Sequence, residues 1–480
     1  MARISAHPNF YPLATVLITG LAALFRFINL ANPHALVFDE TYYVKDAYTL
    51  GLFGHEKQWG EDPNPAFEAG DTSGYTMAGA YVVHPPVGKW IIWFGIQLFG
   101  VESSFGWRFS VALLGTLAIP LVIGIARRVI GSKVFALIAG LLLAVEGQAI
   151  VLARTAILDG ILMFFVLLGF YFLVLDFQSV SRKLNQAAIF GTRRVLFSRP
   201  WLLLAAVSLG LATGVKWSGL YFLAAFGLYS LIYESIIRRR LGLKMLPALM
   251  NAAINAIVMV GAALATYIAS WTGWIVTNDG WGRNQSENWL SALWAYHQNA
   301  YAFHTGLSSE HPYSANALQW IFNLRPTAFY YESFEGSECG LLDKCSIAIT
   351  ALPNPIIWAF GMAAMLWIGY RFLRKFDLAA GLIFVGFLAG WAPWLAYLSR
   401  TTFQFYAVVL SPFVVLALSY ALHRFYRSGF INLRVARRER GILVIVLIAL
   451  LLAIFFASIW MGLPVPYWYW RIQMWLPIWI

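Results

Sequence analysis

Two adjacent carboxylates, Asp39 and Glu40, lie in the stretch VFDETYYVKDAY, directly after an apolar segment. Tyr43, Ala47 and Leu50 follow at helical spacing, so the pair is expected at the N-terminus of a helix. At that position the helix dipole and free backbone N–H groups favour an ionised carboxylate. An ionised carboxylate there can serve as a general base. The alternative interpretation is a helix cap with a solvated loop charge.

Several basic residues interrupt or border apolar segments of the chain, namely Arg108, Arg154, Lys216 and Arg400. Charged side chains in apolar surroundings are costly unless they are paired or hydrated. An ion pair between Arg154 and Asp159, which flank the turn LARTAILD, is one interpretation. The other is a phosphate site, because arginine offers a planar fork of donors and lysine a point charge.

The composition sets the class of protein that carries these residues. Of 480 residues, 60% are hydrophobic, 17% aromatic and only 12% charged, which excludes a water-soluble enzyme. Apolar runs of about twenty residues recur, the length that a helix needs to cross a bilayer. The runs lack the alternating polarity of an outer-membrane barrel. An all-α polytopic membrane protein is therefore predicted.

Eleven membrane spans are predicted, near residues 11–30, 106–126, 134–152, 159–176, 201–215, 217–237, 246–270, 352–370, 379–397, 404–422 and 441–462. They divide the chain into an N-terminal membrane module (1–271, with a first outer loop at 31–105), a second outer loop (272–350) and a C-terminal part (351–480). Apolar residues from Val87 to Leu98 and from Trp289 to Phe303 recur at helical spacing, which predicts one interfacial helix in each outer loop.

Charge gives the expected orientation. Most lysines and arginines fall in alternate loops, which contain few acids, so those loops and the N-terminus are assigned to the cytoplasm and the C-terminus to the outside. The acids of these loops and adjoining helix ends are Asp176, Glu234, Asp377 and Glu439. The net charge of +12 then reflects orientation and contact with anionic inner-leaflet lipids. No nucleic-acid partner is expected.

Three further groups of residues have two interpretations each. His297, His304 and His311 recur every seven residues, but Gly306 and Pro312 interrupt the helix that would align them as metal ligands. The only two cysteines, Cys339 and Cys345, can form a structural disulfide or remain free. The Trp- and Tyr-rich C-terminal segment is typical of an aromatic belt at the outer interface, and it can also border a lipid groove.

Several motifs occur together and in order. The carboxylate pair in FDETYYVKDAY is followed by VHPPVGKW (His84 to Trp90) and by GWRFSVALLG, which contains Arg108. EGQAIVLARTAILDGILMFF, GVKWSGL and HPYSANALQWIFNLRPTAFYYE (His311 to Glu332) come later. This set resembles the protein O-mannosyltransferases, membrane glycosyltransferases of the GT-C class that use a polyprenyl-phosphate mannose donor. The last motif resembles the bacterial branch.

The resemblance implies a GT-C fold of about eleven helices in the cell membrane, with catalysis on the extracytoplasmic face. Asp39 is then expected to activate a Ser or Thr hydroxyl of an exported protein, and Glu40 to bind donor or acceptor. A single displacement would invert the β-linked donor to an α-mannosyl product. Eukaryotic members carry an extra soluble module in the second large loop, for which about eighty residues leave no room here.

The expected site contains further residues. Donor-phosphate binding is assigned to Arg108, Arg154, Lys216 and Arg400, and support of the substrate site to His84, Lys89, Asp159, Tyr313 and Arg325. No metal ligands are assigned, and a divalent metal is left open as a cofactor. The expected partners are polyprenyl-phosphate mannose, exported acceptor proteins during translocation, and membrane lipids.

Two alternatives stay open. A GT-C glycosyltransferase with a lipid or cell-wall glycan as acceptor would share the fold and the donor chemistry. A membrane transporter would instead use charged residues within its spans as a translocation path. The transporter is disfavoured because the polar clusters and both large loops are expected on one side of the membrane.

Overall fold

The computed structural model describes residues 9–191, 198–339, 343–428 and 435–480. Within that part, nine helical segments are long and apolar enough to cross a membrane. They are α1 (Phe10–Phe27), α5 (Ser104–Val129), α8 (Leu158–Phe190), α10 (Gly219–Arg240), α11 (Leu246–Ser270), α15 (Pro355–Lys375), α16 (Leu378–Trp391) with η4 (Ala392–Tyr397), η5 (Gln404–Leu410) with α17 (Ser411–Arg427), and α18 (Val435–Met461). The predicted polytopic helical fold is confirmed.

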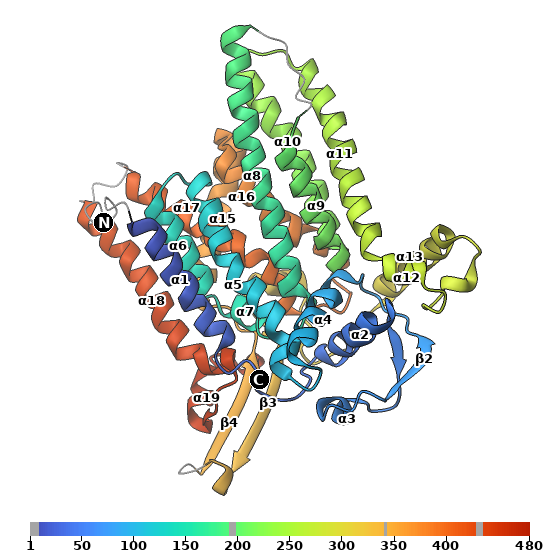
Figure 1. The fold of residues 1–480 in the computed structure, drawn as a ribbon. Helices are drawn as coiled ribbons and strands as arrows, with labels where there is room; N and C mark the ends of the chain where they lie inside the picture. The colour runs from blue at the N-terminus through green and yellow to red at the C-terminus, as the bar shows by residue number, and fades with distance from the viewer. Residues whose placement is uncertain (1–8, 192–197, 340–342, 429–434) are drawn as a thin grey trace.

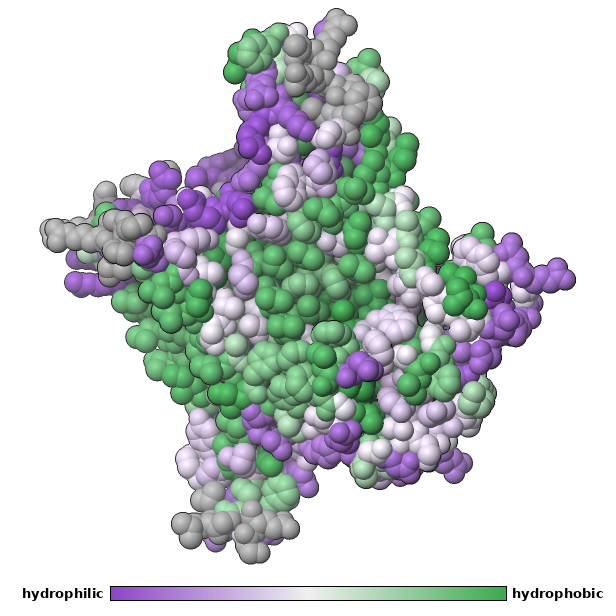
Figure 2. All heavy atoms as spheres, viewed as in Figure 1, coloured by the Kyte–Doolittle hydropathy of each residue, from purple (hydrophilic) through white to green (hydrophobic). Residues whose placement is uncertain are grey.

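The remaining predicted spans correspond to shorter apolar helices. α6 (Lys133–Ala144) and α9 (Pro200–Val215) lie in the helical body, and α7 (Gly147–Val151) follows α6 after a break. The helices expected in the two large loops are present as α4 (Val87–Phe99) and α13 (Trp289–Gly306). Figure 2 shows an apolar belt across the middle of one face, with hydrophilic residues gathered at its ends.

The two large loops lie at the same end of the helical body in Figure 1. The first contains α2 (Glu40–Phe53), the antiparallel strands β1 (Lys57–Trp59) and β2 (Tyr75–Gly79), and α3 (Asn64–Glu68). The second contains α12 (Thr272–Val276), η2 (Arg283–Gln285), α13, α14 (Ala317–Trp320), β3 (Ala328–Glu335), η3 (Gly336–Cys339) and β4 (Lys344–Thr350).

The expectation of an all-α chain needs one correction, because both loops contain small sheets. β3 and β4 pair as a long antiparallel hairpin, and β5 (Val465–Pro466) adds to β4. A disulfide joins Cys339 and Cys345 near the end of this hairpin. The C-terminal α19 (Tyr467–Gln473) folds back onto α18 and β4, and η6 (Pro477–Trp479) bonds through the Trp479 indole to the carbonyl of Asn323. Part of the expected aromatic belt is therefore buried.

Close contacts join the two outer loops. A Cβ atom on Gly273 would lie 2.2 Å from the carbonyl oxygen of Gly54, so the two backbones touch where neither residue has a side chain. The buried ammonium group of Lys57 lies 2.7 Å from Asp279 of the second loop. The loops therefore form one unit over the end of the helical body.

Acids at the end of the helical body away from the two large loops are mostly neutralised. Asp176 pairs with Arg199, Glu234 lies 2.7 Å from Arg238, and Asp377 lies 2.7 Å from Arg371. Pairing removes much of the cost of placing a carboxylate near hydrocarbon. These few acids are thus compatible with the basic loops at this end.

Glu146 explains the break between α6 and α7. Its side chain is fully buried and caps α7 by accepting hydrogen bonds from the backbone N–H groups of Gln148 and Ala149. It also accepts from the backbone of Asn354 at 3.3 Å, from the Trp358 indole at 3.2 Å and from the Ser411 hydroxyl at 3.1 Å. One carboxylate thereby joins α7 to α15 and α17.

Replacement of Glu146 by alanine should therefore destabilise the protein. The substitution leaves several buried donors without an acceptor, which we expect to lower the free energy of unfolding by about 3 kcal/mol. The thermal unfolding temperature in detergent measures the effect. The exposed Glu287→Ala variant is the control, and equal unfolding temperatures for the two variants would show that Glu146 does not hold these helices together.

Candidate active site

A pocket opens at the end of the helical body that carries the outer loops, where the turn between α9 and α10 faces α13 and η4. Its ionisable lining residues are His84, Asp159, Lys216, His304 and Arg400, and Ser218 and Thr305 add two hydroxyls. Its aromatic lining consists of Trp217, Tyr221, Phe222, Tyr301, Trp394, Tyr397 and Tyr406. Aromatic rings together with a few convergent charges are typical of a binding site for an organic ligand.

Lys216 occupies the break between α9 and α10. Its ammonium group lies 2.7 Å from the carboxylate of Asp159, and both side chains are buried. The same ammonium lies 4.6 Å from the centre of the Tyr406 ring. The predicted ion pair between Arg154 and Asp159 is therefore wrong, because Lys216 takes the place of Arg154.

Asp39 lies beside this buried pair, at the N-cap of α2 as expected. Its side chain makes no capping hydrogen bond, and the residue is partly exposed. Burial raises the pKa of Asp39 to about 6; the charge of Lys216 lowers this pKa and that of Asp159 raises it. The expectation that the helix dipole keeps the Asp39 carboxyl ionised is therefore not met, because loss of hydration has the larger effect on its pKa.

Phe38 fixes the backbone next to Asp39. Its φ angle of 50° lies in the left-handed region, which is unfavourable for a bulky residue. The ring packs edge-on against Phe329 at 5.3 Å, Phe403 at 5.4 Å and Phe405 at 5.7 Å between ring centres. This aromatic packing holds the strained backbone and so determines where the Asp39 side chain begins.

Arg400 is the second cation of the pocket. Its guanidinium donates to the backbone carbonyl of His304 at 2.8 Å and to that of Thr401 at 3.3 Å, and it stacks over Trp394. Within the described residues no carboxylate lies within ion-pair distance of it. Arg400 is partly exposed, so its charge is available to an anion in the pocket.

His304 orients Arg400 and connects it to the first outer loop. Its Nε2 lies 3.0 Å from the carbonyl oxygen of Val83, which only accepts, so Nε2 carries the proton. Nδ1 then accepts from the Arg400 guanidinium at 3.3 Å. Burial lowers the pKa of His304 to about 4, so the ring is neutral at pH 7.

His84 packs against His304, with 5.3 Å between ring centres. Burial, together with the charge of Lys216 and the neighbouring His304, lowers the pKa of His84 well below its usual range. The backbone carbonyl of His84 accepts a hydrogen bond from the Lys89 ammonium at 3.1 Å. Lys89 therefore positions the loop and does not line the pocket; its own carboxylate partner is Glu56.

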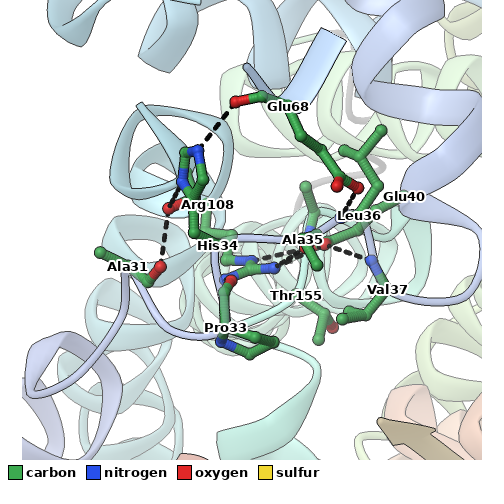
Figure 3. Close-up of polar contacts among 12 residues, drawn as sticks. Ala31, Pro33, His34, Ala35, Leu36, Val37, Glu40, Glu68, Arg108 and Thr155 are labelled. Carbon is green, nitrogen blue, oxygen red and sulfur yellow. Dashed lines mark hydrogen bonds and ion pairs between the residues drawn. The ribbon is translucent and has the colours of Figure 1, made fainter. Parts of the chain in front are cut away.

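Glu40 and Arg108 form a buried ion pair away from the pocket lining, shown in Figure 3. The Arg108 Nε and one terminal nitrogen each lie 2.8 Å from a Glu40 oxygen. Arg108 also donates to backbone carbonyls of the loop between α1 and α2, those of Leu30, Pro33 and Ala35. Every donor position that a phosphate could use is thus turned towards the protein.

The second set of contacts on Glu40 explains its burial. Its carboxylate accepts from the backbone N–H of Val37 at 3.0 Å and from that of Ala156 at 2.7 Å. It therefore ties the start of α2 to the turn before α8. These contacts leave the carboxylate no exposed edge to bind a sugar donor or an acceptor substrate. Glu40 and Arg108 therefore position the Asp39 segment.

Arg154 is likewise used by the protein. Its guanidinium donates to the carbonyls of Phe25, Arg26, Ile28 and Asn29 at the end of α1, and to that of Met461 at the end of α18. It thus closes the C-terminal ends of two helices, where carbonyls lack helical partners. The expected phosphate contact of Arg154 does not fit this arrangement.

Tyr313 and Arg325 lie together outside the pocket lining. The Arg325 guanidinium stacks on the Tyr313 ring at 4.7 Å and donates to the carbonyl of Ile480 at 2.9 Å. The pair anchors the C-terminus to the second outer loop.

Of the expected site residues, the structure therefore brings together Asp39, His84, Asp159, Lys216 and Arg400.

A cluster of three or more His, Cys, Asp or Glu side chains suited to a metal ion is not found among the described residues. His297 instead bonds to the hydroxyl of Tyr267 at 2.6 Å, and only His304 of the three spaced histidines lines the pocket.

Sequence reasoning missed His304 and Tyr406 as site residues. The proximity of Tyr406 to Arg400 in LSRTTFQFY is the signal that could have indicated Tyr406.

Replacement of Arg108 by alanine should destabilise the fold as well as abolish activity. The change leaves the buried Glu40 charge unpaired, which costs about 3–5 kcal/mol. The double variant Glu40→Gln with Arg108→Met should recover part of the lost unfolding temperature, because no buried charge remains unpaired. A normal unfolding temperature of Arg108→Ala with a raised KM for the donor would instead assign Arg108 to donor binding.

Two family models match the chain. Residues 16–276 match the dolichyl-phosphate-mannose-protein mannosyltransferase model, and residues 289–374 match the C-terminal four-transmembrane region of protein O-mannosyltransferases. Curated relatives include the polyprenol-phosphate-mannose–protein mannosyltransferases of Mycolicibacterium smegmatis and Mycobacterium tuberculosis. Each is 32% identical to this chain. The M. smegmatis match covers 98% of this chain and 95% of the relative, and the M. tuberculosis match covers 97% and 91%.

Solved structures share the fold at low sequence identity. The sugar-donor-bound Pmt1-Pmt2 complex of S. cerevisiae matches with a TM-score of 0.78 and 13% identity, over 100% of this chain and 94% of the other. ArnT from Cupriavidus metallidurans, bound to undecaprenyl phosphate, matches with a TM-score of 0.57 and 15% identity, over 93% and 76%. These likenesses confirm the expected GT-C architecture. Together with the family model, the full-length sequence relatives show that the chain belongs to the dolichyl-phosphate-mannose-protein mannosyltransferase family.

Proposed function

We propose that this protein transfers mannose from polyprenyl-phosphate mannose to Ser or Thr hydroxyls of exported proteins. The observation that carries the proposal is the pocket lined by Asp159, Lys216 and Arg400, with Asp39 near enough to Lys216 for the ammonium charge to lower its pKa. The names of the full-length relatives give the same donor and the same acceptor class. The basic inner loops and acidic outer loops support a site on the extracytoplasmic face of the cell membrane.

Asp39 is the general base of this reaction. It takes the proton from the acceptor hydroxyl while the oxygen attacks the anomeric carbon of mannose and the bond to phosphate breaks. The polyprenyl phosphate leaves as an anion. Because one displacement occurs, the configuration of the sugar is inverted.

Arg400 and Lys216 stabilise the departing phosphate. Arg400 presents a guanidinium without a carboxylate partner among the described residues, and a charge in a largely aromatic pocket acts strongly because little water screens it. Lys216 shares its charge between Asp159, Asp39 and the pocket. The aromatic rings provide flat faces for the apolar sides of the sugar and for the start of the lipid chain.

The three parts of the chain contribute separately to this site. Residues 1–271 supply the base and the Lys216 pair, the second outer loop (272–350) supplies His304, and the C-terminal part supplies Arg400.

A glycosyltransferase with a glycan acceptor would use the same donor residues. Mannose labelling of a Thr-rich peptide by the purified protein tests the choice, since labelling of glycan alone would assign the glycan acceptor.

The variant Asp39→Asn should lose transfer activity by at least a thousandfold while retaining its unfolding temperature. Asparagine fills the same space but cannot accept the proton. The assay follows radiolabelled mannose from the lipid donor to a Thr peptide. The control is Asp71→Asn in the exposed part of the first outer loop, and turnover of Asp39→Asn near that of this control would remove Asp39 as the base.

The rate of transfer should fall as the pH drops through about 6, because protonated Asp39 cannot act as a base. Two variants should shift the midpoint of this pH dependence in opposite directions. Lys216→Met removes the charge that lowers the pKa of Asp39, so the midpoint should move to higher pH. Asp159→Asn removes the charge that raises it, so the midpoint should move to lower pH. Profiles of kcat/KM against pH that do not move would contradict the assignment.

A further inference from the structure

A second pocket adjoins the first and shares Arg400 with it. It is a groove between the segment that follows α13 and the segment that follows η4. One side is formed by Ser308, Ser309, Glu310, Ser314, Asn316 and Gln319. The other is formed by the run from Leu398 to Thr402. We call it the hydroxyl groove, because half of its lining residues are serines and threonines.

Backbone hydrogen bonds hold the two sides together. The N–H of Ala315 donates to the carbonyl of Thr402 at 2.7 Å, and Ser314 pairs with Phe403 as an antiparallel bridge. At the other end the N–H of Thr401 donates to the carbonyl of Leu307 at 3.3 Å. The groove is therefore a built feature of the fold, with two chain segments at a fixed separation.

The lining of the groove differs from that of the first pocket. It contains no aromatic side chain, and its apolar members are Ala315 and Leu398 alone. Ser308, Ser309, Glu310 and Ser314 are exposed. A polyprenyl chain would gain little by burial against hydroxyls. A polar chain with backbone donors and acceptors finds partners there throughout.

Both sides of the groove converge towards the general base. His311, which follows Glu310, packs 5.7 Å from the Phe38 ring, and Phe403, which follows Thr402, packs 5.4 Å from it. Asp39 is the residue after Phe38. A chain lying in the groove therefore has one end near the Phe38–Asp39 segment and passes beside Arg400, which also lines the first pocket.

We propose that the hydroxyl groove holds the acceptor polypeptide in an extended conformation, with a Ser or Thr side chain directed past Arg400 to Asp39. The inference rests on the proposed function and adds the place of its second substrate. Donor and acceptor then enter from separate sides: the lipid-linked sugar through the aromatic pocket and the polypeptide along the groove. Backbone atoms of the acceptor supply most of the contacts, so many sequences around the hydroxyl are accepted.

A single engineered thiol tests this placement. Cys339 and Cys345, the only cysteines of the chain, are joined in a disulfide, so Ser314→Cys introduces one free thiol into the groove. A Thr peptide with a bromoacetyl group two residues from the threonine should form a thioether with it by displacement of bromide, as seen in the intact mass. Excess unmodified Thr peptide should prevent the reaction. The control is Ser73→Cys, an exposed position of the first outer loop.

A steric variant gives an independent measurement. Ser314→Trp should fill the groove and raise the KM for the Thr peptide at least tenfold, whereas Ser73→Trp should leave this KM at the value of the unmodified protein. Binding of the lipid donor, measured by quenching of tryptophan fluorescence against each variant's own baseline, reports separately on the first pocket. A KM for peptide within twofold of the Ser73→Trp control would overturn the inference.

The outcomes separate this inference from the proposed function. Failure of the unmodified protein to label any peptide with mannose would reject the proposed function itself. Normal labelling by the unmodified protein, with no cross-link to Ser314→Cys, would reject only the groove. Protection of the engineered thiol by a soluble glycan, but not by the Thr peptide, would also overturn it and assign the groove to a glycan.

Discussion

The buried ion pair between Glu40 and Arg108 is the interaction on which the site depends. Two charges removed from water are stable only while both remain paired and their other hydrogen-bonding positions are filled. Arg108 fills its positions with loop carbonyls, and Glu40 with backbone N–H groups of Val37 and Ala156. These contacts hold the loop between α1 and α2, and so help to place Asp39 near Lys216.

Charge is arranged differently at the reacting end of the site. Asp39 and Asp159 face a single lysine, and Arg400 stands apart with a neutral histidine and backbone carbonyls as neighbours. One of the two acids is therefore poised to gain or lose a proton near physiological pH. Among the residues that the structure describes, no carboxylate pairs with Arg400, so its charge is available to an anionic ligand. The reacting site therefore differs from the Glu40–Arg108 ion pair, in which every charge has its partner.

Much of this arrangement could be predicted from the sequence. Hydropathy and loop charge give the helical membrane fold, and Asp39, His84, Asp159, Lys216 and Arg400 do come together. Arg108 and Arg154 could not be separated from ligand-binding residues, because a charged residue at the edge of an apolar run looks the same whether carbonyls or phosphate satisfy it. The strands β3 and β4 were missed, since neighbouring aromatic and acidic residues in AFYYESFE conceal the alternation of a half-buried strand.

The lengths of two helices have a consequence for the surrounding lipid. α9 has 16 residues and α6 has 12, so at 1.5 Å per residue they span about 24 Å and 18 Å, less than the roughly 30 Å of bilayer hydrocarbon. α9 ends at Val215, with Lys216 as its C-cap. Residues 212–216 are buried against neighbouring helices, so protein and not lipid covers the end of this short helix. The lipid beside it meets longer helices such as α11, and a carrier phosphate has to leave the lipid and enter the protein to reach Lys216.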